Sequence, residues 1–444
     1  MPESRPALRR ELRLSHLVFF NISSVAGVRW LASAAHAGPG SLALWLLAAL
    51  AFLLPSALVV ASLSRRFPEE GGFYVWTKRA FGDWHGFICA WLYFISNILF
   101  LPTLLLSGVT MASYMLGPRG IRYSEDPAFA IPVTLAVLWF AFLVNLVGLR
   151  VGKWPSILGG GSTYLIVVLL GVFGLLVTWR FGSATRFHLI PQASWSSLNF
   201  WSQIALAMTG LELTTVLGGE IQDPAKTIPR AAWISGFSCA AFYIGGTAAL
   251  LALLPPDRIS VLTGLAQAGD TAGARFGANW LSPGFALLIT VGFIGQLSTY
   301  IAANTRLPFA LGVDRYLPPA FAKLHPRWRT PHISIFSQAG LATLLLLLTQ
   351  LGESLRAGYQ ILVDMVVIAT LIPFIYIFGS GFKFGQRWAG IAGGLIAAAG
   401  VLLSMSPPPE VSSVWLFELK VVGGTILLAL AGRATFLRSK AVRG

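Results

Sequence analysis

NISSVAGVR, residues 21–29, interrupts the first long apolar run of the chain with small and hydroxyl-bearing residues. A second interruption, MTGLE at residues 208–212, falls in the sixth apolar run. Backbone that leaves the helix at membrane depth is tolerated only where it is buried in protein or lines a cavity. Two interrupted runs five positions apart indicate an inverted repeat with a binding site near the middle of the membrane. For the first run alone, ordinary packing of small residues between helices is the stronger interpretation.

The composition predicts that most of the chain lies in a membrane. Of its 444 residues, 55% are hydrophobic and 11% are charged, and the mean hydropathy is +0.72. A soluble domain carries about a quarter charged residues, and the apolar runs are too long for the strands of a β-barrel. Since about 20 apolar residues cross a bilayer, we predict an all-α integral membrane protein with twelve transmembrane helices. They lie near residues 15–35, 41–64, 84–116, 128–149, 155–179, 198–218, 229–254, 283–311, 332–350, 357–379, 388–405 and 413–432.

The basic residues predict the orientation of these spans. The chain has 32 Lys and Arg against 17 Asp and Glu, a formal net charge of +15. Most Lys and Arg fall on one side when the N-terminus is placed in the cytoplasm, so the positive-inside rule predicts both termini there. Without a compact basic stripe in the sequence, we predict no nucleic-acid partner. A signal peptide cleaved after Ala34 is the alternative for the first run; Arg29 interrupts its apolar core and argues against it.

Three cytoplasmic loops carry motifs. RFPEEGGFYVW at residues 66–76 follows the second span, GEIQDPAKTIPRA at residues 219–231 follows the sixth, and DRYLPP at residues 314–319 follows the eighth. In this order and at these places, the three motifs resemble those of the amino acid permeases of the amino acid–polyamine–organocation superfamily, and the resemblance covers essentially the whole chain. It implies alternating access and an amino-acid-like substrate.

The resemblance also implies the domain organisation. A single polytopic domain over residues 1–440 would have the five-plus-five inverted-repeat fold of leucine-transporter-like proteins. The first repeat would cover residues 1–179, the second residues 198–379, and two additional C-terminal spans residues 388–432.

The loops make local predictions of their own. Pro68 with Gly71-Gly72 predicts a tight turn before an amphipathic segment. Asp223-Pro224 predicts an N-cap and a first-turn proline that begin a short surface helix. The long outer loop between the seventh and eighth spans is expected to carry a short amphipathic helix.

The interrupted spans offer the chemistry that an amino acid needs. Free amides at the start of a half-helix bind a carboxylate, and free carbonyls at the end of a half-helix bind an ammonium group. In the family that the motifs resemble, span 1 binds the carboxylate and span 6 the ammonium group. Carried over to this sequence, the carboxylate candidates are Ser23, Ser24, Ala26 and Gly27, and the ammonium candidates are Leu206, Thr209 and Gly210. Ser23-Ser24 replaces part of the family's usual glycine-rich run.

Asn97 is a further candidate. It matches an asparagine midway along span 3 that touches substrate in antiporters of that family. A hydrogen bond between two helices is the alternative role.

Three charged residues lie inside predicted spans, namely Glu212, Arg29 and Asp364. A charge at the middle of a span costs about 2.5–3.5 kcal/mol on insertion scales, so each is a candidate functional residue. Glu212 matches a span-6 glutamate that some family members use in proton coupling or gating; fixing the helix break is the alternative. Arg29 and Asp364 lie at similar depth, which permits an ion pair on the outer side. Related five-plus-five transporters have an outer gate between these spans, and the resemblance therefore implies that this pair closes over bound substrate. Separate snorkelling of the two side chains is the alternative.

The driving ion is left open by the sequence. Span 8 carries Ser298-Thr299, a hydroxyl pair that sodium-coupled relatives use beside the carbonyls of span 1. Hydroxyls in transmembrane helices also commonly bond their own backbone. Protons through Glu212, sodium, and exchange all remain possible driving reactions.

The sequence therefore predicts a secondary active transporter that moves an amino acid across the inner (cytoplasmic) membrane by alternating access, with proton coupling or exchange favoured over sodium. The alternatives are a polyamine or organic cation transporter of the same superfamily, a sodium-coupled symporter, and a non-transporting sensor on the same scaffold. A polyamine site needs several buried carboxylates, and only Glu212 and Asp364 are available, so a small or medium neutral amino acid is favoured. The expected partners are this substrate, H+ or Na+, and membrane lipid.

No cofactor, metal site or enzymatic activity is predicted. The six histidines lie in loops or at span ends without the spacing of metal ligands. The two cysteines, Cys89 and Cys239, lie inside apolar runs, where packing is their expected role.

Overall fold

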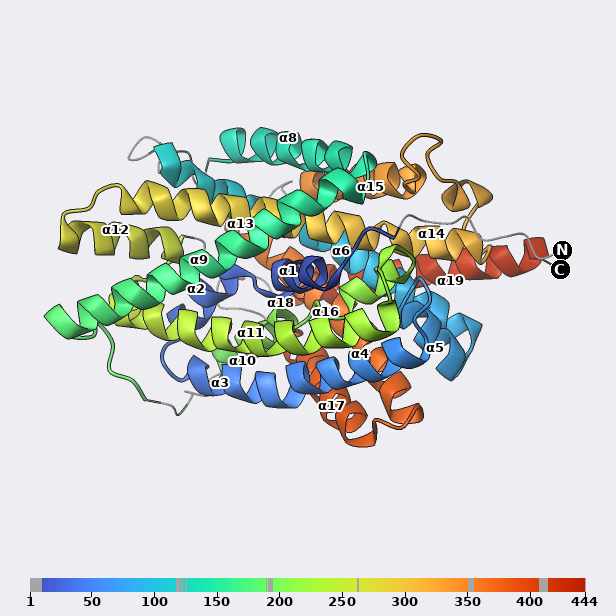
Figure 1. Cartoon of the computed structure of the whole chain (residues 1–444), viewed down its shortest axis with the longest axis horizontal. Coiled ribbons are helices and arrows are strands. Elements are labelled where there is room, and N and C mark those ends of the chain that lie inside the picture. Colours follow the sequence, from blue (N-terminus) through green and yellow to red (C-terminus); the bar gives the residue numbers. More distant parts are fainter. Residues whose placement is uncertain are drawn as a thin grey trace.

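The computed structural model describes residues 10–116, 120, 123, 126–188, 190, 195–261, 263–349, 355–406 and 414–443. These residues are mostly helical, and most of the long helices run roughly along one axis of the molecule (Figure 1). The one isolated β-bridge among them joins Leu12 to Ile221. The predicted span ends at residues 350 and 413 lie outside the described residues.

The helices follow the predicted spans closely. With η marking short 3₁₀ or π segments, the elements are α1 (Leu14–Val25), α2 (Val28–His36), α3 (Ser41–Ala48), η1 (Ala49–Leu53), α4 (Leu54–Arg66), α5 (Phe73–Phe81), α6 (Asp83–Ala112), η2 (Ser113–Leu116), α8 (Pro127–Leu146), α9 (Leu149–Phe181), α10 (Trp195–Ala207), η3 (Leu213–Glu220), α11 (Pro224–Leu253), η4 (Pro256–Arg258), α12 (Gly264–Phe276), α13 (Leu281–Asn304), α14 (Arg306–Val313), η5 (Pro319–Ala322), α15 (His332–Thr349), α16 (Leu355–Lys383), α17 (Arg387–Leu403), α18 (Val414–Glu418), η6 (Leu419–Gly423) and α19 (Gly424–Arg443).

Many of these helices are long and apolar enough to cross a membrane. Within the described residues, nine stretches meet this criterion, and two shorter apolar helices coincide with the predicted ninth and eleventh spans. The remaining predicted span, the sixth, is divided into α10 and η3. The chain is therefore a multi-pass helical membrane protein. The total of twelve spans and the inverted repeat stay predictions.

Both predicted interruptions are present. Span 1 leaves the helix at Ala26 and Gly27, between α1 and α2. Span 6 leaves it between Ala207, the end of α10, and Leu213, the start of η3. Within this second break Gly210 has φ +126°, a backbone conformation that favours glycine. Each break leaves backbone amides and carbonyls beyond the reach of regular helical hydrogen bonds.

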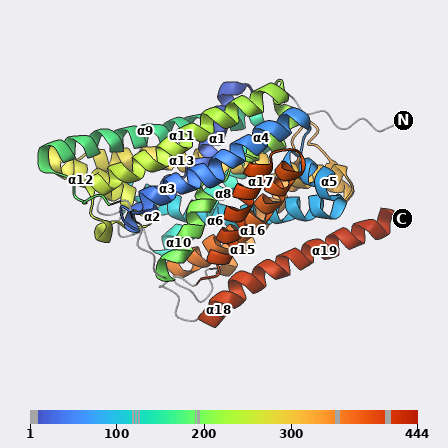
Figure 2. The same ribbon diagram turned by 90° about the horizontal axis from the view of Figure 1, so that it is seen from below.

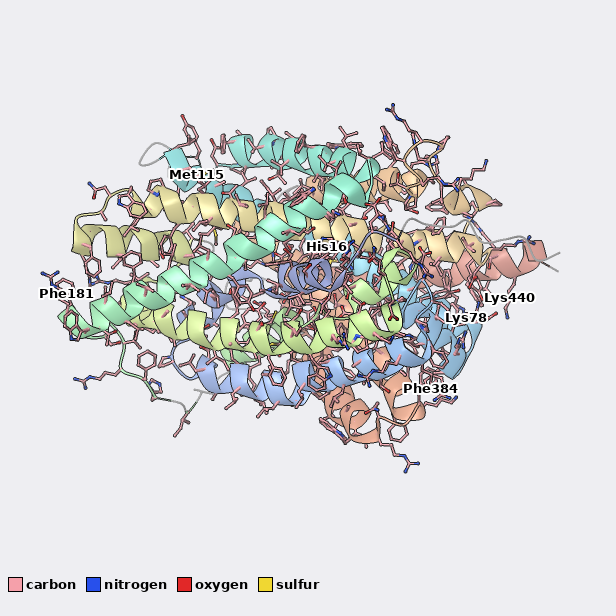
Figure 3. The ribbon with its side chains drawn as sticks, in the orientation of Figure 1. His16, Lys78, Met115, Phe181, Phe384 and Lys440 are labelled. Atoms are coloured by element: carbon pink, nitrogen blue, oxygen red, sulfur yellow. The ribbon has the colours of Figure 1, made fainter. Side chains whose placement is uncertain are left out.

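The two ends of the molecule differ. The amphipathic helix expected in the long outer loop is present as α12, and it lies at the opposite end from α5 (Figures 1 and 2). In Figure 3, Lys78 and Lys440 lie toward the α5 end, whereas Phe181 lies at the α12 end. The carboxyl end of α19 lies on the α5 side in both ribbon views.

The tight turn predicted before α5 is confirmed. Gly71 and Gly72 have φ values of +97° and +44°, which glycine adopts without steric cost. A Cβ atom on Gly72 would lie 2.1 Å from Oγ1 of Thr215, so the turn packs directly against η3. The glycines therefore bring the loop after span 2 into contact with the end of span 6.

The prediction of a separate short helix after Asp223 is wrong. Pro224 does occupy the first turn, but the helix that it begins is α11, which continues for 30 residues to Leu253. Asp223 has φ +48° and makes no side-chain cap. Pro229 lies inside this helix, and α11 continues through it.

Helices α9 and α13 approach closely at a pair of glycines. A Cβ atom on Gly159 would lie 2.5 Å from Cα of Gly295, and a Cβ atom on Gly295 would lie 2.5 Å from Cα of Gly159. Small residues at such a crossing let two helix backbones come together in a membrane. This contact fixes α13 against α9 beside the interrupted spans.

Candidate functional site

A small cavity lies where the two interrupted spans face each other. Its volume is about 20 Å³, enough for about one water molecule and too small for an amino acid. The lining comes from both sides of the span-1 break, from the end of α10, and from α6, α13 and α16. It comprises Ser24, Val25, Trp30, Tyr93, Ser96, Asn97, Phe100, Leu206, Ala207, Thr209, Gln296, Tyr300, Val366 and Thr370. Helices must therefore separate before this site can admit an amino acid.

Ser24 connects the two breaks directly. Its Oγ lies 3.0 Å from the carbonyl oxygen of Gly210 and 2.9 Å from that of Asn21, and its single hydroxyl proton donates to one of them at a time. Gly210 lies close to span 1, because a Cβ atom there would come within 3.1 Å of Ser24 atoms. The interruptions are thus parts of one site.

Tyr243 on α11 is a second connection between the breaks. Its hydroxyl accepts a hydrogen bond from the Gly27 amide at 3.0 Å. It donates to the carbonyl of Val25 at 2.5 Å or to that of Ala207 at 3.0 Å. The ring is fully buried and stacks on Trp45 with 4.3 Å between centroids. The sequence does not single out this residue, whose only local signal is a polar aromatic side chain inside the apolar seventh span.

Tyr243→Phe is expected to impair transport more than Tyr300→Phe. The first change removes the hydroxyl that contacts both breaks, whereas the second removes a bond to Ser24 alone. An unsatisfied buried polar group costs about 1–3 kcal/mol. When this cost weakens the binding site, it lowers kcat/KM by about 5- to 150-fold. Initial rates of uptake into proteoliposomes measure both variants. Equal rates for the two would show that Tyr243 does not organise the breaks.

The break in span 1 has the features of an anion-binding helix start. Gly27 is the N-cap of α2, and no side chain caps the helix, so its first amides lack the partner that a cap would supply. A Cβ atom on Gly27 would lie 2.7 Å from the Trp30 ring. Ser24, Val25 and Trp30, on the two sides of this break, line the cavity.

The break in span 6 presents the opposite end of a helix. Leu206, Ala207 and Thr209 line the cavity at the carboxyl end of α10, where the Leu206 carbonyl accepts from the Thr209 amide at 3.0 Å and the Ala207 carbonyl accepts from Tyr243. The Thr209 hydroxyl donates to the Leu206 carbonyl at 2.7 Å. The cavity thus lies between a helix amino end and a helix carboxyl end, the arrangement that complements an anion and a cation held close together.

The remaining candidates for substrate contact are divided between lining and supporting positions. Ser23 points away from the cavity and donates to the Ser156 carbonyl on α9 at 2.8 Å. Ala26, Gly27 and Gly210 belong to the breaks but do not line the cavity. Asn97 does line it.

The Asn97 amide is only half satisfied. Its Nδ2 donates to the Tyr93 carbonyl of its own helix at 2.8 Å. Its buried Oδ1 has no hydrogen-bond partner among the described residues. A buried acceptor without a donor is costly, so a ligand with an N–H or O–H group would be stabilised beside it.

Glu212 is fully buried beside the cavity. One carboxylate oxygen accepts from the Tyr93 hydroxyl at 2.5 Å, and the other accepts from the Gly210 amide at 2.9 Å. Tyr93 lines the cavity, whereas Glu212 does not. The carboxylate therefore joins α6 to the span-6 break, one side chain away from the cavity.

The structure contains no ion pair between Arg29 and Asp364, both of which lie in its described part. Nη1 of Arg29 donates to the Thr103 hydroxyl at 3.1 Å, and its guanidinium lies over the rings of Trp30 and Phe100. Asp364 is fully buried on α16. Helix α2 packs mainly against α11 and α12, whereas α16 packs against α17 and α6, so equal depth does not bring the two charges together.

The hydroxyl pair on α13 does not reach span 1 in this structure. Ser298 donates to the Gly152 carbonyl at 3.1 Å, and Thr299 donates to Gly295 in its own helix at 2.9 Å. Two residues missed by the sequence analysis, Gln296 and Tyr300, instead donate to the Ser24 carbonyl at 3.3 and 2.9 Å.

Backbone hydrogen bonds and an ion pair hold the interrupted spans together at the α5 end. The Leu12 amide donates to the Glu220 carbonyl at 3.0 Å, and the Gln222 amide donates to the Leu12 carbonyl at 2.9 Å. Arg306 forms a buried ion pair with Glu220, with Nη2 to Oε1 at 3.0 Å and Nε to Oε2 at 3.2 Å. Span 1, span 6 and α14 therefore meet at this end.

A second ion pair at the α5 end joins α5 to the third loop motif. Lys78 contacts Asp314 at 2.8 Å, and the Tyr74 hydroxyl donates to the same carboxylate. Partial burial acts to lower the pKa of Lys78, but the hydrogen bond and the charge of Asp314 outweigh it and raise that pKa above its usual value. Burial, together with the Asp314 carboxylate, raises the pKa of Tyr74. Lys78 therefore stays protonated and Tyr74 stays a hydrogen-bond donor at neutral pH.

Across the described residues, no three His, Cys, Asp or Glu side chains gather as a metal ion would require. Polar side chains from several helices converge on the small cavity.

Comparison with known proteins agrees with this geometry. Residues 12–405 match the family described as amino acid permeases. An uncharacterized transporter of Legionella pneumophila is 26% identical, over 94% of this chain and 95% of its own length. The serine/threonine exchanger SteT of Bacillus subtilis is 28% identical, over 78% of this chain and 76% of its own. A probable agmatine/putrescine antiporter of Lactococcus lactis, AguD, is 25% identical, over 63% and 59%.

Proposed function

The chain belongs to the amino acid permease family and is a membrane transporter, and we propose that it moves an amino acid across the cytoplasmic membrane by alternating access. The observation that carries this proposal is the pair of helix breaks facing one cavity, with a helix amino end on one side and a helix carboxyl end on the other. An amino acid carries a carboxylate and an ammonium group on one carbon, and these two helix ends complement the two charges.

We propose that the fold is organised as the sequence indicates, with twelve spans, two inverted repeats over residues 1–179 and 198–379, and both termini in the cytoplasm. The α5 end would then be the cytoplasmic end. The basic residues Lys78 and Lys440 lie toward that end (Figure 3), which supports this orientation.

For energy coupling we favour protons or exchange. Glu212 is an ionisable group one side chain from the cavity, through its bond to Tyr93. Sodium receives less support, because Ser298 and Thr299 bond to α9 and α13 backbone and not to span 1. One relative of this chain is itself named an exchanger. Asp364 keeps a proposed gating role, since it is an ionisable side chain that is fully buried on α16.

A polyamine is the second candidate substrate, and the named agmatine/putrescine antiporter among the relatives favours it. Against it, the described residues that line the cavity include no Asp or Glu. Both oxygens of Glu212 already accept hydrogen bonds. A dication would therefore find no uncommitted carboxylate among these lining residues, whereas an amino acid brings its own.

Uptake of labelled amino acids into proteoliposomes tests the proposal. We expect saturable uptake that is driven either by an inward proton gradient, and then abolished by a protonophore, or by amino acid preloaded inside. Parallel reactions with and without sodium identify uptake that is driven by sodium. Labelled putrescine tests whether a polyamine is the substrate. If putrescine alone is taken up, or if no amino acid enters under any of the three conditions, the proposal is wrong.

A further inference from the structure

Arg29 has unused hydrogen-bonding capacity in a buried position. The residue is 2% exposed. Nη1 donates to Thr103, while Nε and Nη2 have no hydrogen-bond partner among the described residues. These two nitrogens form one edge of the guanidinium, and that edge is the planar fork that binds both oxygens of a carboxylate.

No protein carboxylate in the described part of the chain neutralises this guanidinium through an ion pair. The rings of Trp30 and Phe100 lie 4.4 and 4.6 Å from its central carbon. Cation–π contacts of this kind lower the cost of the buried charge, but they leave the N–H groups of Nε and Nη2, which lie in the plane of the guanidinium, without acceptors. A buried, unpaired cation at membrane depth is therefore a binding site for an anion.

The Arg29 guanidinium lies behind two rings of the cavity wall. Trp30 and Phe100, the two rings under the guanidinium, both line that cavity. An amino acid needs more room than the 20 Å³ available, so its entry must displace part of this wall. Movement of either ring would bring the Arg29 edge into contact with the bound molecule.

The Arg29 side chain and the start of α2 are separate anion-binding elements. The α2 amides begin at the Gly27 N-cap, and Ser24 and Val25, just before that N-cap, line the cavity. The Arg29 guanidinium lies instead beyond the rings, against Thr103 of α6. A molecule with two carboxylates can use both elements at once.

We propose that Arg29 binds the side-chain carboxylate of the substrate, and that the substrate class is therefore the acidic amino acids, with glutamate or aspartate preferred over the corresponding amides. This inference rests on the proposed function and narrows it. It replaces the small or medium neutral amino acid that the sequence favours, because that preference counted only the protein's carboxylates and not an unpaired cation beside the cavity.

Glutamate and glutamine are a matched pair for the test, since they differ only in one carboxylate against one amide. Uptake of each is measured in proteoliposomes at pH 7 for the unaltered protein. We expect kcat/KM to favour glutamate by about 10-fold or more, as a site built around a polar partner discriminates strongly against an analogue that lacks it. No preference for glutamate in the unaltered protein overturns the proposal without any variant.

Three variants then assign the preference to the guanidinium edge. Arg29→Gln should lower glutamate uptake by about 100-fold while glutamine uptake stays within about threefold. Arg29→Lys, which keeps the charge but not the planar fork, should be intermediate. Thr103→Val, which removes the one hydrogen bond to Arg29 and leaves its free edge, should keep the glutamate preference.

The outcomes separate this inference from the proposed function. If Arg29→Gln lowers the uptake of glutamate and of glutamine by the same factor, Arg29 binds the α-carboxylate or supports the fold, and the substrate assignment is wrong. If the unaltered protein transports neutral amino acids and not acidic ones, the assignment is wrong while the proposed function stands. If it transports neither, the proposed function fails, and the assignment falls with it.

Discussion

Glu212→Gln is expected to abolish accumulation of substrate against its gradient while exchange of substrate persists. The amide preserves the local geometry, because its oxygen accepts from the Gly210 amide and its NH2 group donates to the Tyr93 hydroxyl, which can accept as well as donate. What the variant loses is the proton that a carboxyl group takes up and releases. Proton transfer by a positioned group is worth about 100-fold or more in rate, and we expect proton-driven uptake to fall by at least that factor.

The measurement is the ratio of internal to external substrate in proteoliposomes under an inward proton gradient. Exchange with preloaded substrate in the same vesicles controls for folding and binding. Tyr93→Phe is the matched control, since it removes one hydrogen bond to the carboxylate and keeps the ionisable group; it should retain accumulation. If Glu212→Gln accumulates substrate as well as the unaltered protein does, Glu212 only fixes the helix break.

Removal of either partner of the buried Arg306–Glu220 pair is expected to destabilise the protein strongly. The pair joins α14 to the end of η3, and Arg306 also donates to the Ala302 carbonyl and the Thr305 hydroxyl. Loss of one partner leaves a buried charge without its counter-charge, which costs about 3–5 kcal/mol. We expect Glu220→Gln and Arg306→Met each to lower the unfolding midpoint in detergent.

The double variant distinguishes an uncompensated charge from lost packing. Glu220→Leu with Arg306→Met removes both charges and keeps apolar volume, and a buried pair replaced in this way often loses little stability. The double variant should therefore unfold at a higher temperature than either single variant. A double variant less stable than both singles would show that the hydrogen bonds of the pair, and not charge balance, hold α14 to η3.

The helix breaks could be predicted from the sequence because their signal is local. Residues 21–29 and 208–212 place small and polar residues in the middle of apolar runs, and the structure leaves the helix within both stretches. Helices α5 and α12 were predictable for a similar reason, since turn glycines and amphipathic patterns lie next to one another along the chain.

The rotation of each helix about its axis could not be predicted in the same way. Ser298 and Thr299 sit at the right depth, but successive residues of a helix point about 100° apart. Gln296 and Tyr300, four residues apart and hence on one face, point to Ser24, and Ser298 points to α9. Depth follows from the residue count along a span, whereas rotation depends on how distant spans pack together.

Arg29 shows the same limit with a different result. The rings that its guanidinium contacts line the cavity, but the partner chosen by depth, Asp364, lies on a helix that α2 does not pack against closely. Tyr243 could not be found at all, because the two groups that it joins are distant in the sequence. Gly27 lies 216 residues away from it and Ala207 lies 36 residues away. Contacts of this separation appear only when the folded chain brings the helices together.

The contact of Gly159 with Gly295 provides an internal reference distance for spin-label measurements. The two helix backbones already touch, and neither glycine can gain a Cβ atom without separating them. Spin labels at surface positions of α9 and α13 near this contact would report one narrow distance distribution in every state in which the contact persists. If the distance between α9 and α13 stays constant while the distance between labels on α2 and α10 changes, the movement belongs to the interrupted spans themselves.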